Sequence, residues 1–154
     1  MWREDQDLTS PTSPQNGINK SYITPEGDLS PASPTGAYKD REVTVTEHIL
    51  GGFRKTAKSN SPYTSFTDIE ATTTNYGNNV IEIDVNRLTN DINSGKLTDV
   101  EILTPDQVQK AIKADTTSGD YWKNLASKWA ARDSEFLVKG VIPKEYITIK
   151  GGTN

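Results

Sequence analysis

"SPYTSFTD", residues Ser61–Asp68, is the stretch that most constrains the fold. Six of its eight residues are hydroxyl-bearing or aromatic, and successive side chains of a strand point to opposite sides. One side would carry Ser61, Tyr63, Ser65 and Thr67, and the other Pro62, Thr64, Phe66 and Asp68. Because a strand that only fills a core would carry Val, Ile or Leu, the row of hydroxyls predicts a strand beside a polar site. The alternative is a half-exposed edge strand, since Thr and Tyr favour strands.

Length and composition limit the classes of protein that fit. The chain has 154 residues, 32% of them hydrophobic, which predicts one domain with a lean core. The net charge of −4 argues against sequence-independent binding of nucleic acid or an anionic membrane, although it leaves local basic patches open. There is no apolar run of about 20 residues for a membrane span, and "MWREDQDLTS" does not resemble a signal peptide. With no cysteine and one histidine, we expect no disulfide and no thiolate or histidine-cluster metal site.

The first 40 residues differ from the rest of the chain. Five of the eight prolines lie between Pro11 and Pro34, among Ser, Thr, Gly and Asn, so that a disordered linker or a cloning remnant is one interpretation. The segment also holds Trp2, Tyr22 and Leu29, more apolar anchors than a linker needs. We therefore expect a first strand over residues 1–4, then a long Pro/Ser-rich loop over residues 8–40 that lies on a single domain of residues 1–154.

Hydrophobic periodicity and caps predict the remaining elements. A helix is expected from Val43 to Ser59 with Thr46 as its N-cap, and another begins at Thr104 as N-cap, with Pro105 in its first turn. Further helices are expected over residues 86–95 and 118–132, a short helix or turn over 68–79, and strands ending near 68 and over 80–85, 97–103, 135–140 and 145–150. Because strands and helices mingle without a regular βαβ repeat, the fold class is α+β.

Familiar catalytic motifs are absent. No serine lies in a G-x-S-x-G turn, and no Gly-rich phosphate loop of either common type occurs. His48 stands alone in a helical pattern, which favours a structural role. Trp122 and Trp129 lie seven residues apart with apolar residues between them, which is typical of a helix side packed on a core.

Three short segments share one chemistry. They are "WRED" (residues 2–5), "SPYTSFT" (61–67) and "DSEFLVKGVIP" (133–143). In this order they resemble the Arg–Ser–Glu branch of the ADP-ribosyltransferase superfamily, and most closely the C-terminal toxin domains of bacterial polymorphic toxins, including Rhs-repeat proteins. The resemblance spans residues 2 to about 149. It implies an α+β fold with two packed, mostly antiparallel sheets around an NAD cleft and flanking helices.

The resemblance also implies a role for each site residue. Glu135 would stabilise the cationic sugar that forms as nicotinamide leaves, Ser65 would orient Glu135, and Asp133 would be its catalytic neighbour, placed on the same side of the strand. Arg3 would clamp the diphosphate of NAD, because its planar fork of donors suits phosphate oxygens. The full cofactor-binding set would be Arg3, Tyr63, Thr64, Ser65, Phe66 and Thr67, with the ring of Tyr63 or Phe66 facing the nicotinamide.

Such a domain would act as an antibacterial effector. The resemblance implies a mono-ADP-ribosyltransferase that uses NAD as substrate without a metal and modifies a macromolecule, such as the translation protein elongation factor Tu. It would be delivered by a secretion system, such as type VI, and act in the cytoplasm of the target cell, and a cognate immunity protein would block it. For that partner, we expect anchors at Tyr63, Phe66, Trp129 and Arg132. We expect neither membrane nor nucleic acid as a partner.

Two departures leave alternatives open. The Ser-Thr-Ser triplet of the family is Ser65-Phe66-Thr67 here, and the Glu-x-Glu pair of arginine-modifying members is Asp133-Ser134-Glu135. Arginine as the acceptor is therefore in doubt, because an aspartate is one methylene shorter than a glutamate. An NAD glycohydrolase that depletes NAD, or a non-catalytic binding module, would also fit the pattern.

Overall fold

The computed structural model describes residues 2–5, 9, 11, 20–38, 41–51, 53, 55–68 and 79–151. Its strands are β1 (Trp2–Asp5), β2 (Tyr22–Ile23), β3 (Leu29–Ser30), β4 (Ala37–Tyr38), β5 (Arg41–Glu42), β6 (Tyr63–Thr67), β7 (Asn79–Ile83), β8 (Glu101–Leu103), β9 (Glu135–Lys139) and β10 (Ile147–Gly151). Its helices are α1 (Val45–Ile49), α2 (Lys55–Ser59), α3 (Val85–Asn93), α4 (Pro105–Ala114), α5 (Asp120–Arg132) and a 3₁₀ turn, η1 (Lys144–Tyr146).

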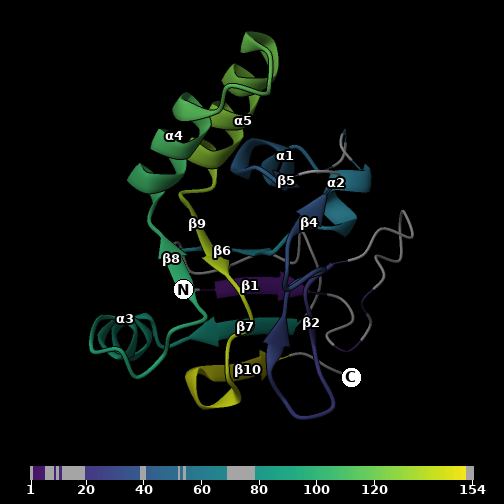
Figure 1. Ribbon diagram of the computed structural model, residues 1–154. Coiled ribbons are helices and arrows are strands. Elements are labelled where there is room, and N and C mark those ends of the chain that lie inside the picture. Colours follow the sequence, from purple (N-terminus) through teal and green to yellow (C-terminus); the bar gives the residue numbers. More distant parts are fainter. Residues whose placement is uncertain are drawn as a thin grey trace.

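One six-stranded sheet organises the described part of the chain. Its order is β10-β7-β1-β6-β9-β8, and every neighbouring pair is antiparallel. β6 pairs with β9 along its whole length, whereas β1 meets β6 at a single residue pair, Trp2 and Thr67. The sheet therefore consists of two three-stranded parts that join at β1 and β6, and Figure 1 shows β8 and β9 running at a steep angle to β1, β7 and β10. This architecture confirms the α+β class.

Strand β9 is buried on both of its faces. Leu137 and Val138, adjacent on β9, are both fully buried, one in each of two apolar clusters. Leu137 packs with helices α1, α4 and α5, and Val138 with Ile81, Phe66 and neighbours. α3 lies at the end of the molecule opposite α4 and α5 (Figure 1). Because β6 is an inner strand between β1 and β9, the edge-strand explanation of its hydroxyl row is wrong.

The predicted helix from Val43 to Ser59 is wrong in its length and its cap. Two short helices, α1 and α2, occupy the segment, and the N-cap of α1 is Thr44. Thr44 Oγ1 accepts from the Glu47 backbone N–H at 3.1 Å, and Glu47 accepts from the Thr44 N–H at 3.0 Å, so the two residues form a capping box. The predicted cap, Thr46, lies inside α1 and is buried.

Other boundaries follow the predicted pattern with shifts of a few residues. Thr104 caps α4 and Pro105 opens it, as predicted. The strand expected over residues 80–85 ends at Ile83, because Asp84 is already the N-cap of α3. The strand expected over 97–103 forms only over 101–103. The turn predicted over 68–79 falls mostly outside the described residues.

The described residues of the first 40 form strands that belong to the domain. β1 forms over residues 2–5, one residue later than predicted. Within the predicted loop, β2 and β3 pair as a short hairpin, and Leu29 is fully buried against Ile142 of the C-terminal part. The described residues 20–38 therefore pack on the domain, whereas residues 12–19 lie outside the described part.

Gly140, directly after β9, should tolerate no side chain. Its φ is +99°, and a Cβ atom there would collide with the Asp99 backbone carbonyl oxygen. We expect Gly140→Ala to lower the free energy of unfolding by about 3 kcal/mol, from left-handed backbone strain plus overpacking. Gly95→Ala is the control, because Gly95 has φ +82° but nothing within 4 Å of its Cβ; it should cost about 1 kcal/mol. Equal losses in urea unfolding would show that the contact with Asp99 is unimportant.

Candidate active site at the junction of β1, β6 and β9

Glu135 begins β9 at the place where the two parts of the sheet meet. It pairs directly with Thr67 of β6, so its side chain shares a face of the sheet with Thr67 and Ser65. Burial raises the pKa of the Glu135 carboxyl, and the hydrogen-bonding Ser65 hydroxyl and the charges of Lys58 and Arg3 act in the opposite direction. The carboxyl group therefore lies in a partly dry environment beside two cations.

Arg3 reaches this place from β1. Its Nη1 donates to the Ser65 backbone carbonyl oxygen at 3.4 Å, a long hydrogen bond. Its positive charge also acts on the pKa of His48, Lys58 and Glu135. Arg3 and Ser65 are 62 residues apart in the chain, and Ser65 and Glu135 are 70 residues apart. The three residues nevertheless lie on consecutive strands of the sheet, β1, β6 and β9.

A chain of hydrogen bonds runs toward Glu135. The Tyr63 backbone N–H donates to Ser61 Oγ at 3.1 Å, Ser61 Oγ lies 2.6 Å from His48 Nδ1, and His48 Nε2 lies 2.8 Å from Ser65 Oγ. An ionised carboxylate can only accept, so the Ser65 hydroxyl donates to Glu135 and must accept from His48. His48 is then the Nε2–H tautomer, and its Nδ1 accepts from Ser61. Every donor in the chain points toward the carboxylate of Glu135.

A second contact requires the same tautomer of His48. Lys58 Nζ lies 3.5 Å from His48 Nδ1, and an ammonium group can only donate. Nδ1 must therefore be the unprotonated acceptor, as the contacts of Ser65 and Glu135 also require. The imidazole is neutral, which agrees with a His48 pKa held well below its usual value by burial and by the charges of Lys58 and Arg3.

His48 is buried, which agrees with the structural role that the sequence favoured. It also forms a hydrogen bond with Ser65, a residue of the candidate site. It is buried within α1, and the edge of its ring meets Tyr63, with ring centres 5.6 Å apart. The pattern around position 48 shows only a lone histidine in a helix. The link to Ser65 depends on how α1 packs on β6, which local sequence does not reveal.

The neutral state of His48 should make stability fall in mild acid. Because its folded pKa is lowered, below about pH 6.5 the unfolded chain takes up a proton that the folded chain does not, so this contribution is full above pH 6.5 and is lost as the pH falls. We expect the stability advantage of wild type over His48→Gln to shrink as the pH falls from 7 to 5. Chemical denaturation at both pH values measures it. The comparison cancels the opposite effect of Glu135, and a constant difference would contradict a neutral buried His48.

Lys58 is a further residue of the candidate site, and its role is not visible in the local sequence. It lies on α2, and burial together with the charge of Arg3 lowers its pKa to about 8, while Glu135 acts in the opposite direction. Gly51 makes room for it, since a Cβ at Gly51 would meet Lys58 Cδ at 2.7 Å. In the sequence, Lys58 resembles any polar helix residue.

Asp133 does not occupy the predicted position on the strand. It caps the C-terminal end of α5, and its carboxylate pairs with Arg132 at 3.0 Å in an exposed ion pair. Ser134 follows with φ +46°, so the chain turns sharply before β9 begins. Asp133 and Glu135 therefore do not share one face of a strand. Thr67 Oγ1 donates to the Asp133 backbone carbonyl at 2.8 Å and joins this turn to β6.

Thr64 and Phe66 point away from the site. Thr64 is 1% exposed and shares a hydrogen bond with Ser21, and Phe66 is 3% exposed within an apolar cluster. The cofactor contacts predicted for them do not fit, because alternate residues of β6 face opposite sides of the sheet. Tyr63 stays on the face of Ser65 and is half-buried. Of the two predicted ring platforms, only Tyr63 lies on the correct side.

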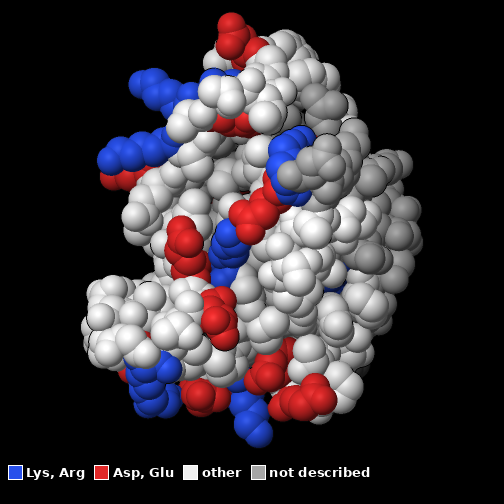
Figure 2. Space-filling view, in the orientation of Figure 1, with Lys and Arg blue, Asp and Glu red and all other residues white. Residues whose placement is uncertain are grey.

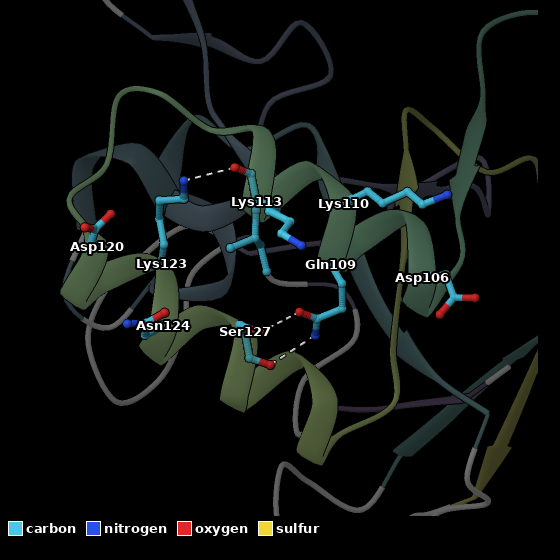
Figure 3. Close-up of a pocket in the computed structure, with 9 residues that line it drawn as sticks. Asp106, Gln109, Lys110, Lys113, Asp120, Lys123, Asn124 and Ser127 are labelled. Carbon is cyan, nitrogen blue, oxygen red and sulfur yellow. Dashed lines mark hydrogen bonds between the residues drawn. The ribbon is translucent and has the colours of Figure 1, made fainter.

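The helices α4 and α5 enclose a separate open groove of about 540 Å³. Figure 3 shows Lys110, Lys113 and Lys123 among its polar lining, with the Gln109 and Ser127 side chains bonded to each other across it. The described lining comes from these two helices, whereas Glu135 lies on β9. The groove is therefore not part of the candidate site.

The two predicted core tryptophans lie on the other side of α5. Trp122 and Trp129 are partly buried against the cluster of Leu137, and both contact Phe53, with ring centres 5.5 and 5.9 Å from it. Phe53 itself is 58% exposed. The core-packing prediction for the tryptophans is thus confirmed.

Comparison of the chain with models of protein families, with curated proteins and with solved structures finds no match. Within the described residues, no group of three or more His, Asp or Glu side chains could hold a metal ion. No described helix is both long and apolar enough to cross a membrane.

Proposed function

We propose that this protein is an NAD-dependent mono-ADP-ribosyltransferase that acts as a bacterial effector toxin. One observation carries the proposal: Arg3, Ser65 and Glu135, widely separated in the chain, converge where the two parts of the sheet join. The α+β architecture, with a three-stranded part on each side of this junction, supports an ADP-ribosyltransferase-like cleft. The order of the three motifs supports the same class.

The reaction needs a fixed negative charge beside the ribose. The bond between ribose C1 and the nicotinamide nitrogen breaks, and its electron pair leaves with nicotinamide. C1 becomes cationic, an acceptor atom then bonds to it, and the proton of the acceptor is released to water or a base. Glu135, oriented by Ser65 and held by the chain from His48, would stabilise this cation in a partly dry site, where a charge acts more strongly than in water.

The position of Asp133 suggests which kind of molecule accepts the ADP-ribose. The Asp133 carboxylate lies at the exposed end of α5, near enough to Glu135 to raise its pKa. In this position it would meet a macromolecular acceptor rather than NAD. A protein of the translation machinery, such as elongation factor Tu, in the cytoplasm of the target cell is the acceptor we propose.

A second candidate function is NAD hydrolysis without transfer. The ion pair between Asp133 and Arg132 favours it, because a carboxylate engaged with its neighbour does not position an acceptor. Water would then take the place of the acceptor, and the toxin would act by depleting NAD.

A cognate immunity protein is the partner that we propose for either activity. Of the four anchors expected from the sequence, Phe66 is excluded because it is buried in the core. Tyr63, Trp129 and Arg132 retain exposed surface near the end of α5 or on the face of Ser65. Co-expression of the immunity protein should rescue growth of a sensitive bacterium.

The deciding experiment incubates the protein with a bacterial lysate and NAD that carries one label on the nicotinamide and another on the adenylate phosphate. Nicotinamide release measures cleavage, and label on the adenylate phosphate measures transfer to macromolecules. Release with transfer supports the transferase, and release without transfer supports the hydrolase. If the folded protein does neither and is harmless when expressed, both enzymes are excluded and a binding module remains.

A further inference from the structure

Ser134, in the turn between α5 and β9, has an unfavourable backbone conformation. Its φ is +46°, and in the described part of the chain it is the one non-glycine residue with a positive φ. A left-handed conformation brings the Cβ of an L-residue close to the following carbonyl oxygen, so it persists only where neighbouring contacts enforce it. Such residues cluster at functional sites, and Ser134 directly precedes Glu135. The turn must therefore be held by its surroundings.

Hydrogen bonds from both sides hold this turn. On the helix side, the Asp133 N–H donates to the Trp129 carbonyl at 3.2 Å, and the Ser134 N–H also donates to a carbonyl of α5. On the sheet side, the Thr67 hydroxyl donates to the Asp133 carbonyl at 2.8 Å. Thr67 is also the residue of β6 that pairs with Glu135. One residue of β6 thus fixes both ends of the short connection between α5 and β9.

The conformation of Ser134 decides which carboxylate enters the site. In an extended chain, residues two positions apart point to the same side, so Asp133 and Glu135 would lie together. In the left-handed turn, the Asp133 carboxylate instead pairs with Arg132 at the exposed end of α5. The Glu135 carboxyl group bonds to Ser65 in a largely desolvated place. Figure 2 shows charges of both signs spread over the visible face, so an exposed carboxylate is ordinary here, whereas the enclosed one depends on the turn.

We propose that Thr67 and Ser134 are positioning residues, which hold the turn so that Glu135 presents its carboxyl group to the ribose of NAD. Both act through Glu135 and not on the reacting atoms. This role differs from the cofactor contact that the family resemblance implies for Thr67, whose hydroxyl proton is already given to the Asp133 carbonyl. The inference rests on the proposed function, because it assigns two further residues to the same reaction.

Steady-state kinetics of nicotinamide release separate positioning from cofactor binding. Thr67→Val keeps the branched shape but has no hydroxyl, so its kcat should fall about tenfold while the KM for NAD stays within about twofold of the wild-type value. Thr67→Ser keeps the hydroxyl and should retain most of kcat. A raised KM with an unchanged kcat would place Thr67 against the cofactor and overturn the proposal.

A second substitution at Ser134 provides a rescue that only the positioning role predicts. Asparagine adopts the left-handed conformation more readily than serine, so Ser134→Asn should restore most of the kcat that Thr67→Val loses. Ser94→Asn in the same background is the control, because Ser94 ends α3 with an ordinary φ of −81°. The control should restore nothing. If Ser134→Asn also restores nothing, Thr67 does not act through the turn, and the proposal is wrong.

Ser134→Gly loosens the same turn without any change in β6. Glycine takes positive and negative φ about equally, so the variant relieves the strain but no longer fixes the turn. It should therefore fold, as circular dichroism would show, and have a lower kcat than wild type at a temperature far below its melting point. A residue that served stability alone would leave kcat unchanged in the folded variant, and that result would overturn the role of Ser134.

A titration of the Glu135 carboxyl group by carbon-13 NMR tests positioning without any turnover. Because the turn sets the surroundings of this group, its titration midpoint should move in Thr67→Val and return when Ser134→Asn is added. An unmoved midpoint overturns the proposal whether or not the protein cleaves NAD. A midpoint that moves and returns in a folded protein that releases no nicotinamide would confirm that both residues position Glu135, and would reject the proposed enzyme.

Discussion

Replacement of Glu135 by glutamine is expected to lower the rate of NAD cleavage by about 100-fold or more. Glutamine keeps the shape of the side chain and can still bond to Ser65, but it has no negative charge to stabilise the cationic ribose. Nicotinamide release under saturating NAD measures the effect. Because the carboxyl group is desolvated and its pKa is raised by burial, the neutral variant should melt at the same or a higher temperature.

Glu101→Gln is the matched control for this experiment. Glu101 is an exposed carboxylate on β8 of the same sheet, so its loss changes the net charge by the same amount. It should cleave NAD at the wild-type rate. If Glu135→Gln is folded and also keeps the wild-type rate, Glu135 is not the catalytic carboxylate, and the proposed mechanism is wrong.

Replacement of Arg3 by methionine is expected to raise the KM for NAD by about 10- to 100-fold with little change in kcat. A hydrogen bond to a charged group contributes about 1.5–3 kcal/mol, and a diphosphate far from the breaking bond is held equally in the ground state and the transition state. Arg3→Lys should recover only part of the affinity, because lysine lacks the planar fork.

Arg87→Met is the control for Arg3, since Arg87 lies on α3 at the other end of the sheet, over the ring of Tyr146. Its KM should equal that of wild type. An unchanged KM in Arg3→Met would show that β1 contributes only to the sheet. A fall in kcat as large as the rise in KM would instead place Arg3 beside the reacting atoms.

Local sequence was sufficient at the start of α4, where a short-range contact determines the structure. The capping residues Thr104 and Pro105 predict the start of α4 because a helix cap involves only the first turn. The same reasoning failed at α1, where Thr44 and Thr46 are both possible caps. Glu47, three residues after Thr44, completes a capping box, and this residue decides between them.

Alternation along β6 carried most of the information about the site. It places Tyr63, Ser65 and Thr67 on one face, and the structure agrees. It also predicts that Thr64 and Phe66 face away, so assigning both faces to the cofactor was inconsistent with the pattern itself. Asp133 could not be placed from spacing, because a positive φ at Ser134 interrupts the strand geometry that the spacing assumed.

By itself, the sequence determined the fold class, most elements and the order of Arg3, Ser65 and Glu135 along the chain. Only the tertiary structure placed His48 and Lys58 beside them, on two short helices packed against the strands. The physical reason is that strand and helix periods describe which face a side chain takes, over a few residues. Which helix covers that face depends on burial of apolar surface between distant segments, and the tautomer of His48 and the pKa of Lys58 follow from that packing.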